Sequence, residues 1–217
     1  MQPSAPERPS IWPLLSSLGS HVKIAYFRRN QTIFSKGDHS DSIFYIQKGS
    51  VKLTLTSRHG KEAVIAVLAA GSFFGDTAFA ADRPTRPNHA VALMDVRAAR
   101  IDPDAMLRLL HKDEHVCDAV ISSLTSLKTT IIGSLGDNLL YSSEERLARA
   151  LLWIAELYEH PERQPYPKLR QQDLANMIGI TRQRVNFFLK RFQKSGFVDY
   201  GDGLRVHSSI AKVVGKD

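Results

Sequence analysis

The chain has 217 residues, enough for two ordinary domains, and its composition of 43% hydrophobic and 24% charged residues is that of a globular protein. A formal net charge of +7 and a pI of about 9.6 make nucleic acid a candidate partner. A single cysteine excludes an internal disulfide and a four-cysteine iron–sulfur site.

Nothing in the sequence indicates export or a membrane. The first ten residues, MQPSAPERPS, lack the apolar core of a signal peptide, and we expect a disordered arm over 1–10. No apolar run approaches the roughly 18 residues that a membrane helix needs. We therefore expect a soluble, cytoplasmic protein without a membrane partner.

The segment 11–115 has the pattern of a small β domain. Apolar and polar residues alternate in IFYIQKGSVKLTLT, which starts at Ile43. RHGKE predicts a hairpin turn, 63–68 the returning strand, and 91–101 a further strand. Many short strands with turns between them predict an antiparallel barrel or a double-sheet roll, whose interior can hold one ligand.

One loop of this domain, FFGDTAFAADRPTRPNHAVAL (73–93), combines two patterns. It begins like a backbone cradle for a phosphate, with Gly75 followed by the acid Asp76. It then places Pro84 and Pro87 where a cradle needs N–H donors. The loop is therefore either a site for a small anionic effector or a crossing between strands that keeps the outline of one.

The second half is expected to be helical, with a start at 102–104 and a long helix over 116–140. An apolar stripe on this helix has spacings of four, four, three, four and four, which are typical of a coiled-coil seam. We expect the seam to face a second copy of the chain in a homodimer, while Ile121, Ile132 and Leu139 pack on the helix's own roll. The seam consists of Val116, Val120, Leu124, Leu127, Ile131 and Leu135.

Two glycines, Gly133 and Gly136, fall near the end of the long helix. Each weakens the helix by about 1 kcal/mol relative to Ala. Our hypothesis is that they form a hinge that stiffens when an effector binds.

The most specific motif lies in the C-terminal part, 141–217. LRQQDLANMIGITRQRVNFFLKRFQKSGF (169–197) predicts two short helices around the turn residue Gly179, with Thr181 as the N-cap of the second. The second helix repeats apolar residues at i, i+3, i+4 and i+7, and a strand, a Gly-Asp-Gly turn and a strand follow. This order predicts a winged helix-turn-helix.

The opposite face of the second helix is polar and cationic. Its amide and guanidinium groups suit bidentate contacts to base edges, and an exposed phenylalanine suits a thymine methyl. We therefore predict that this face binds double-stranded DNA. The predicted DNA-binding residues are Thr181, Arg182, Gln183, Arg184, Asn186, Phe187 and Lys190.

The stretches GDHSDSIFYIQKGSVKL (37–53), AGSFFGDTAF (70–79) and the helix pair with its wing resemble the CRP/FNR family of bacterial transcription regulators. The resemblance covers the chain after its first ten residues. It implies an α+β fold with an N-terminal cyclic-nucleotide-binding-type β-roll (a double-sheet jelly roll), a long dimerisation helix and a C-terminal winged helix-turn-helix. It also implies a homodimer on a palindromic operator, gated by an effector in the roll, with RNA polymerase as a further candidate partner.

The DNA-reading residues match the family only in part. Arg182 stands where the family has a base-contacting arginine. Gln183 replaces the glutamate of the cyclic-AMP branch, and Phe187 replaces another arginine of that branch. The operator sequence is therefore expected to differ from that of the cyclic-AMP branch.

The effector site departs further. Gly75 and Asp76 stand at the ribose-binding pair of the cyclic-AMP branch, and a shift of one residue places Arg86 and Pro87 at its phosphate-binding pair. Pro87 lacks a hydroxyl and an N–H, and hydrogen bonds to a charged group contribute about 1.5–3 kcal/mol each. The adenine-binding positions correspond to Thr129 and Thr130, or to Ile131 and Ile132 in a second alignment.

Several effectors stay open at this point. Cyclic AMP, cyclic GMP and a cyclic dinucleotide are the candidates, and no cofactor is certain. One alternative is a regulator of the same fold with a vestigial pocket, and another is a haem-based gas sensor that uses His89 or His21. We expect no metal site at His111 and His115, an inert Cys117 and no enzymatic activity, because no nucleophile–base pair is evident.

Overall fold

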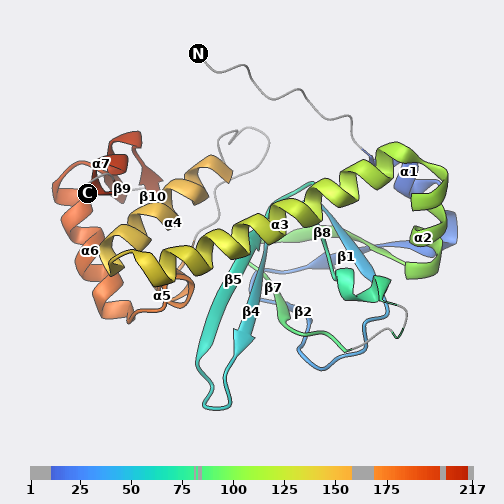
Figure 1. Cartoon of the computed structure of the whole chain (residues 1–217), viewed down its shortest axis with the longest axis horizontal. Helices are drawn as coiled ribbons and strands as arrows, with labels where there is room; N and C mark the ends of the chain where they lie inside the picture. Colours follow the sequence, from blue (N-terminus) through green and yellow to red (C-terminus); the bar gives the residue numbers. More distant parts are fainter. Residues whose placement is uncertain (1–10, 81, 83–84, 158–168, 201–203, 215–217) are drawn as a thin grey trace.

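The computed structural model describes residues 11–80, 82, 85–157, 169–200 and 204–214. A two-sheet domain, a long helix and a smaller helical domain follow one another along the chain (Figure 1). The predicted arm over 1–10 and the Gly-Asp-Gly turn of the wing lie outside the described residues. No helix in the described part combines the length and the hydropathy that crossing a membrane requires.

The N-terminal domain is a double-sheet roll, which confirms the predicted fold class. Its sheets have the strand orders β1-β8-β3-β6 and β2-β7-β4-β5, and all neighbouring strands are antiparallel. The strands are β1 (Val22–Phe27), β2 (Thr32–Phe34), β3 (Ile43–Lys48), β4 (Val51–Thr56), β5 (Glu62–Leu68), β6 (Phe73–Phe74), β7 (His89–Ala92) and β8 (Val96–Ile101).

Strand β3 shows why the roll has two cores. Its residues Ile43–Ile46 are all buried, because Phe44 and Ile46 face the opposite sheet whereas Ile43 and Tyr45 face helices. A strand buried on both faces is a continuous apolar run instead of an alternating one. The covering helices are α1 (Trp12–Ser16), α2 (Pro103–Lys112) and the start of α3 (Glu114–Leu140).

The strand expected over 91–101 is in fact two strands. The chain leaves β7 in one sheet and enters β8 in the other, so it crosses between the layers over residues 93–95. The crossing is held by hydrogen bonds from Leu93 N to Ser50 O (2.9 Å) and from Arg29 N to Asp95 Oδ1 (2.9 Å). Apolar periodicity could not detect this break, because residues on both sides of it are buried.

Helix α3 starts at Glu114, where Asp113 caps it by accepting hydrogen bonds from His115 N and Val116 N. It crosses the molecule from α2 to the C-terminal helices (Figure 1). The expected orientation of its faces is wrong for the first four residues of the predicted seam. Val116 and Val120 are buried against the roll of the same chain, and Leu124 and Leu127 pack on the two roll clusters.

The side that was expected to pack on the roll is exposed instead. Ile121, Ile132 and Leu139 are 57%, 60% and 75% exposed, and Leu135, the last residue of the predicted dimer seam, is 59% exposed beside them. Positions 121, 125, 128, 132, 135 and 139 are spaced four, three, four, three and four, as in a coiled-coil seam. This outer seam is apolar at Ile121, Ile132, Leu135 and Leu139 and polar at Thr125 and Lys128. The N-terminal part of the predicted seam is thus covered by the chain's own roll, whereas Ile131 (37% exposed) and the outer seam are free in the single chain.

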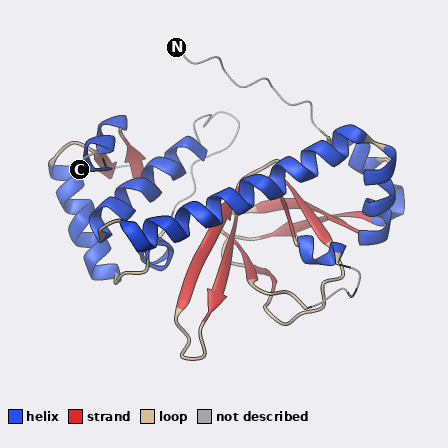
Figure 2. Ribbon diagram, viewed as in Figure 1, coloured by secondary structure: helices blue, strands red, loops and turns tan. Residues whose placement is uncertain are grey.

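The C-terminal domain combines helices with a two-stranded sheet (Figure 2). Its elements are α4 (Ser143–Leu157), α5 (Gln171–Ile178), α6 (Arg182–Lys194), β9 (Val198–Tyr200), β10 (Leu204–Val206) and α7 (Ala211–Val214). A capping box begins α4, with Ser142 N donating to Glu145 Oε2 (2.8 Å) and Glu145 N to Ser142 Oγ (3.4 Å).

Candidate DNA-binding surface and effector pocket

Helices α5 and α6 form the predicted helix-turn-helix. Gly179 ends α5 with φ of 73°, a left-handed conformation that glycine adopts without steric cost. Thr181 begins α6, and its Oγ1 accepts a hydrogen bond from Arg184 N at 3.3 Å. The turn between the helices is therefore fixed by two residues whose chemistry the sequence already displays.

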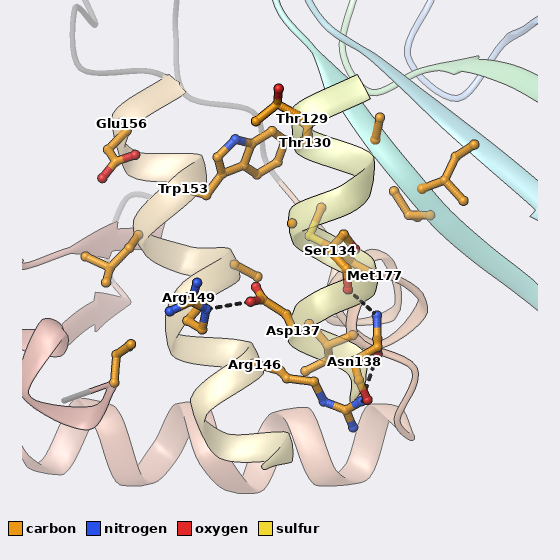
Figure 3. A pocket seen from close by; sticks show the side chains of 18 residues that line it. Thr129, Thr130, Ser134, Asp137, Asn138, Arg146, Arg149, Trp153, Glu156 and Met177 are labelled. Carbon is orange, nitrogen blue, oxygen red and sulfur yellow. Dashed lines mark hydrogen bonds and ion pairs between the residues drawn. The ribbon is translucent and has the colours of Figure 1, made fainter. Parts of the chain in front are cut away.

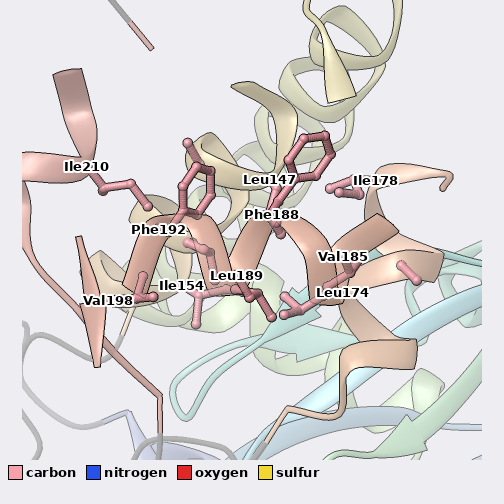
Figure 4. Packing of buried hydrophobic residues seen from close by; sticks show 13 residues of the cluster. Leu147, Ile154, Leu174, Ile178, Val185, Phe188, Leu189, Phe192, Val198 and Ile210 are labelled. Atoms are coloured by element: carbon pink, nitrogen blue, oxygen red, sulfur yellow. The ribbon is translucent and has the colours of Figure 1, made fainter. Parts of the chain in front are cut away.

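The apolar side of α6 is the core of this domain. Figure 4 shows Phe188, Leu189 and Phe192 among the buried side chains from α4 and α5. Val185 is fully buried, and the other three are at most 6% exposed. With one side of α6 fixed in this core, the other side must face outward.

The outward side of α6 carries the predicted DNA contacts. Arg182, Gln183, Arg184 and Lys190 are exposed, and Phe187 is 62% exposed. Thr181 is exposed too, although its hydroxyl already caps the helix. Asn186 is half-buried, and its Oδ1 accepts from Gln171 Nε2 at 3.3 Å, so this side chain also positions α5 against α6.

In the roll, Arg86 is directed inward. Its guanidinium donates from Nη1 to Gly75 O (2.9 Å) and from Nη2 to Ser42 O (2.6 Å), and it lies 4.4 Å from the centroid of the Phe34 ring. Only 2% of the residue is exposed. Burial lowers the pKa of Arg86, and the nearby Asp41 carboxylate opposes that shift. The charge expected to bind a phosphate is thus engaged by the protein itself.

Gly75 is required by this arrangement for two reasons. Its φ is 82°, and a Cβ at this position would lie 2.8 Å from Arg86 Nη1. Asp76, the next residue, is exposed at the start of a short 3-10 helix, η2 (Asp76–Phe79). Pro87 is exposed, and Pro84 lies outside the described residues.

The pocket around Arg86 has a volume of about 690 Å³. At its edge Asp41 accepts a hydrogen bond from Arg100 Nη2 at 2.7 Å and lies 3.9 Å from Arg86 Nη2. Burial acts to raise the pKa of Asp41, but hydrogen bonds from Ser42 and Arg100 bring it below its ordinary value. An incoming anion would therefore meet a carboxylate beside the two arginines.

Thr129 and Thr130 do not line the pocket that contains Arg86. They line a separate cavity of about 450 Å³ between the two domains. The reason is the rotation of α3, which directs Leu124 and Leu127 toward the roll. The structure therefore does not bring together the two halves of the effector site predicted from the sequence.

A charged contact between the domains had no signal in the sequence. Lys52 Nζ of β4 lies 2.9 Å from Glu62 Oε1 and 2.8 Å from Asp173 Oδ1 of α5. Asn176 Nδ2 donates to the same Glu62 oxygen at 3.1 Å, and Arg170 Nε to Asp173 Oδ2 at 3.1 Å. Helix α5 is thus held against the β4–β5 hairpin.

The other candidates from the sequence are dispersed. His111 and His115 are exposed, Cys117 is half-buried, and no group of three or more metal-ligating side chains occurs among the described residues. His89 Nδ1 accepts a hydrogen bond from Lys36 N at 3.2 Å. The haem hypothesis and the hinge hypothesis stay predictions.

Known proteins resemble the chain in both domains. Residues 24–113 match the cyclic nucleotide-binding domain, and residues 145–209 match the Crp-like helix-turn-helix domain. A CRP-like cAMP-activated global transcriptional regulator of Mycobacterium tuberculosis is 23% identical over 187 residues, which cover 85% of this chain and 83% of the relative. The cAMP-activated regulator Vfr of Pseudomonas aeruginosa is 24% identical over 192 residues, with 85% and 88% covered.

A solved structure supports the fold over nearly the whole chain. The c-di-GMP-responsive global regulator CLP of Xanthomonas campestris matches with a TM-score of 0.75 at 18% identity, covering 92% of this chain and 100% of that chain. The order of domains, the helix-turn-helix and the roll agree with these relatives. The chain belongs to the CRP/FNR family of transcription regulators.

Proposed function

We propose that the protein is a homodimeric regulator that binds a two-fold symmetric DNA site through α6 and responds to a small effector. The observation that carries this proposal is the exposed face of α6, on which Arg182, Gln183, Arg184, Phe187 and Lys190 are all exposed. Arginine and glutamine are side chains that form paired hydrogen bonds to base edges in the major groove. The core beneath α6 keeps this face turned outward.

A second copy of the chain is the natural occupant of the outer seam of α3. The seam leaves Ile121, Ile132, Leu135 and Leu139 more than half exposed. A stripe with alternating spacings of four and three fits another helix of the same kind. A dimer through α3 would place two α6 helices in a two-fold relation, as a palindromic site requires.

The effector in this proposal is a cyclic nucleotide, either mononucleotide or dinucleotide, bound in the roll. Its phosphate would have to replace the carbonyl groups of Gly75 and Ser42 as the partner of Arg86. A second candidate function follows from the same observation. In it, the roll is a structural domain with a vestigial pocket, and the regulator acts without a cyclic nucleotide there.

Selection of duplexes from a random library tests the DNA-binding function. We expect a palindromic consensus whose affinity falls steeply as salt rises, because each phosphate contact releases counterions. Arg182→Ala should weaken binding roughly 5- to 150-fold, the equivalent of ~1–3 kcal/mol for one base contact. Arg97→Ala is the matched control, since Arg97 is an exposed cation of β8 in the roll. Equal binding by both variants would falsify the assignment of α6.

A further inference from the structure

A cavity of about 450 Å³ lies between the two domains. Strand β5 and helix α3 line one side, and α4, α5 and α7 line the other. Figure 3 shows side chains from α3 and α4 converging on it. Its volume is in the range of small-molecule sites, about 300–1,000 Å³. We propose that this cavity binds a small anion with a flat aromatic or heteroaromatic ring, and that the bound ligand sets the orientation of the DNA-binding domain.

The middle of the cavity suits a flat ring. Trp153 of α4 is half-buried and lies between α4 and α3, close to Thr129 and Thr130 (Figure 3). An indole face stacks favourably on another aromatic ring. Val64, Ala66, Met177 and Ile178 add apolar surface, and the two threonine hydroxyls supply hydrogen bonds for the ring edge.

One end of the cavity suits an anion. Arg149 Nε donates to Asp137 Oδ1 at 2.7 Å, so the charge of this arginine is already balanced. Arg146 Nη1 donates to the neutral Asn138 Oδ1 at 2.7 Å, and Arg146 makes no ion pair with a described residue. Its Nε is buried and has no hydrogen-bond partner there. A half-buried cation with only neutral partners favours a negatively charged ligand group at this end of the cavity, whereas the exposed carboxylate of the lining, Glu156, lies toward the Trp153 end (Figure 3).

The two ends have a spacing that one ligand can bridge. Arg146 and Trp153 are seven residues apart on α4, which is about 10.5 Å along a helix axis. A two-ring system with an acidic substituent spans such a distance. The proposed class therefore includes nucleotides and aryl acids, and it excludes aliphatic acids that lack a ring for Trp153.

Gly133 extends the cavity to the backbone of α3. It lines the cavity, and a Cβ placed on it would meet no atom within 4 Å. A glycine inside a helix costs about 1 kcal/mol relative to Ala. Since Ala would fit here without a clash, the glycine is not imposed by helix packing. It leaves room beside α3 for a ligand.

The cavity is well placed to control DNA binding, and this step rests on the proposed function. A ligand that contacts α3 and β5 on one side and α4 and α5 on the other binds tightly to only one arrangement of the domains. It shifts the population toward that arrangement in proportion to its difference in affinity for the two. The orientation of α6 relative to the dimer helix changes with it.

The probe for this proposal is 1-anilinonaphthalene-8-sulfonate, which joins flat rings to a sulfonate. The chain has two tryptophans, so Trp12→Phe leaves Trp153 as the only energy donor to the bound dye. We expect saturable one-site binding with quenching of Trp153 fluorescence. Gly133→Phe should weaken binding at least tenfold by filling the cavity, whereas Gly133→Ala should keep it. Ser126→Phe, an exposed position of α3 outside the cavity, is the control for added bulk.

A second variant keeps the test decisive if Gly133→Phe does not fold. Arg146→Gln should weaken the sulfonate dye at least tenfold, but not N-phenyl-1-naphthylamine, which lacks the sulfonate. Equal loss of both dyes would contradict the proposed anion contact. Loss of dye binding in Arg86→Ala, with Gly133→Phe unchanged, would place the dye in the roll and overturn the proposal.

The effect of the bound ligand on DNA binding is tested with the duplex obtained from the random-library selection. Saturating dye should change the affinity for that duplex at least threefold in the Gly133→Ala protein and not in Gly133→Phe. A protein that binds the duplex but shows no dye-dependent change would overturn the inference and leave DNA binding intact. Dye binding without any binding of duplex would instead overturn the proposed function.

Discussion

Lys52 of the roll and Asp173 of the helix-turn-helix form an ion pair with an Nζ–Oδ1 distance of 2.8 Å, and each side chain is only 6% exposed. The two residues are 121 positions apart in the chain. Arg170 and Glu62 complete the contact, so that each buried charge has a partner of opposite sign. This pair joins the two domains in the structure.

Breaking the pair should be costly. Lys52→Met removes the shorter of the two cation contacts of the buried Asp173 carboxylate and leaves it only the partly exposed Arg170. Removal of one partner of a buried ion pair costs up to about 3–5 kcal/mol. The double variant Lys52→Met/Asp173→Leu should recover part of the lost free energy of unfolding, because the charges that then lose a partner, Glu62 and Arg170, are 34% and 54% exposed and can be hydrated. Urea denaturation followed by tryptophan fluorescence measures both.

A surface ion pair provides the matched control for this experiment. Arg100 and Asp41 are 2.7 Å apart, with side chains 49% and 60% exposed. Arg100→Met should therefore change the free energy of unfolding by less than about 1 kcal/mol. A loss in Lys52→Met no larger than in Arg100→Met would show that the interdomain pair is unimportant.

Docking of α5 on the roll should depend on acid pH. Burial acts to raise the pKa of Asp173, but hydrogen bonds from Arg170 and Lys52 lower it below its ordinary value, which is about 3.9. A lowered folded-state pKa stabilises the contact above pH ~4, and that stability is lost as the pH falls through the folded-state pKa. Hydrogen exchange of α5 between pH 6 and 3 should reveal the loss. Asp173→Asn should not show this acid-dependent step.

Arg86 should contribute to the stability of the roll in the absence of any nucleotide. Arg86→Ala leaves the carbonyl oxygens of Gly75 and Ser42 without their donor and opens a cavity beside Phe34. Unpaired buried groups cost about 1–3 kcal/mol each, so the melting temperature should fall by several degrees. Arg97→Ala, at an exposed position, should melt close to the parent protein. An unchanged melting temperature in Arg86→Ala would mean that the inward hydrogen bonds are dispensable.

The outer seam of α3 should control oligomeric state. Leu135→Asp introduces a charge into the exposed stripe and should convert dimers to monomers in sedimentation experiments. Affinity for a palindromic duplex should fall with it, while affinity for a half-site should persist. Ser126→Asp, exposed on another side of α3, should remain dimeric. Dimers of undiminished stability in Leu135→Asp would assign the contact to another surface.

Phe187 should specify a base and Lys190 a phosphate. Phe187→Ala removes an apolar group that is 62% exposed on α6 and should relax selection at one base pair without altering the salt dependence. Lys190→Ala should weaken binding to all sequences alike and reduce the slope of log affinity against log salt by about 1. The selection and the salt titration distinguish these outcomes. If Phe187→Ala selects the same sequences as the parent, the ring does not contribute to specificity.

Local chemistry made the helix-turn-helix predictable. Thr181, Gly179 and the apolar spacing of α6 act within a few residues of one another, and the structure confirms the helices they predicted. The faces of α3 were not predictable in the same way. Both sides of the helix carry apolar stripes, and the choice between them depends on sheets formed far away in the sequence.

The prediction of the effector site failed for a related reason. The inward position of Arg86 depends on Ser42, 44 residues away, and the sequence shows only that the loop contains an arginine. The placement of Thr129 and Thr130 depends on the rotation of α3, where a shift of one residue turns a side chain by about 100°. The Lys52–Asp173 pair was not foreseen at all, because neither residue belongs to a recognisable motif.

The buried ion pair also has a consequence for how the chain folds. Lys52 is buried against the helix-turn-helix, and Asp173 is buried against the roll. Each domain therefore supplies the counter-charge for a buried charge of the other. A domain expressed alone would present its half of the contact to water. The two domains should therefore unfold together, in a single cooperative transition, although each has its own hydrophobic core.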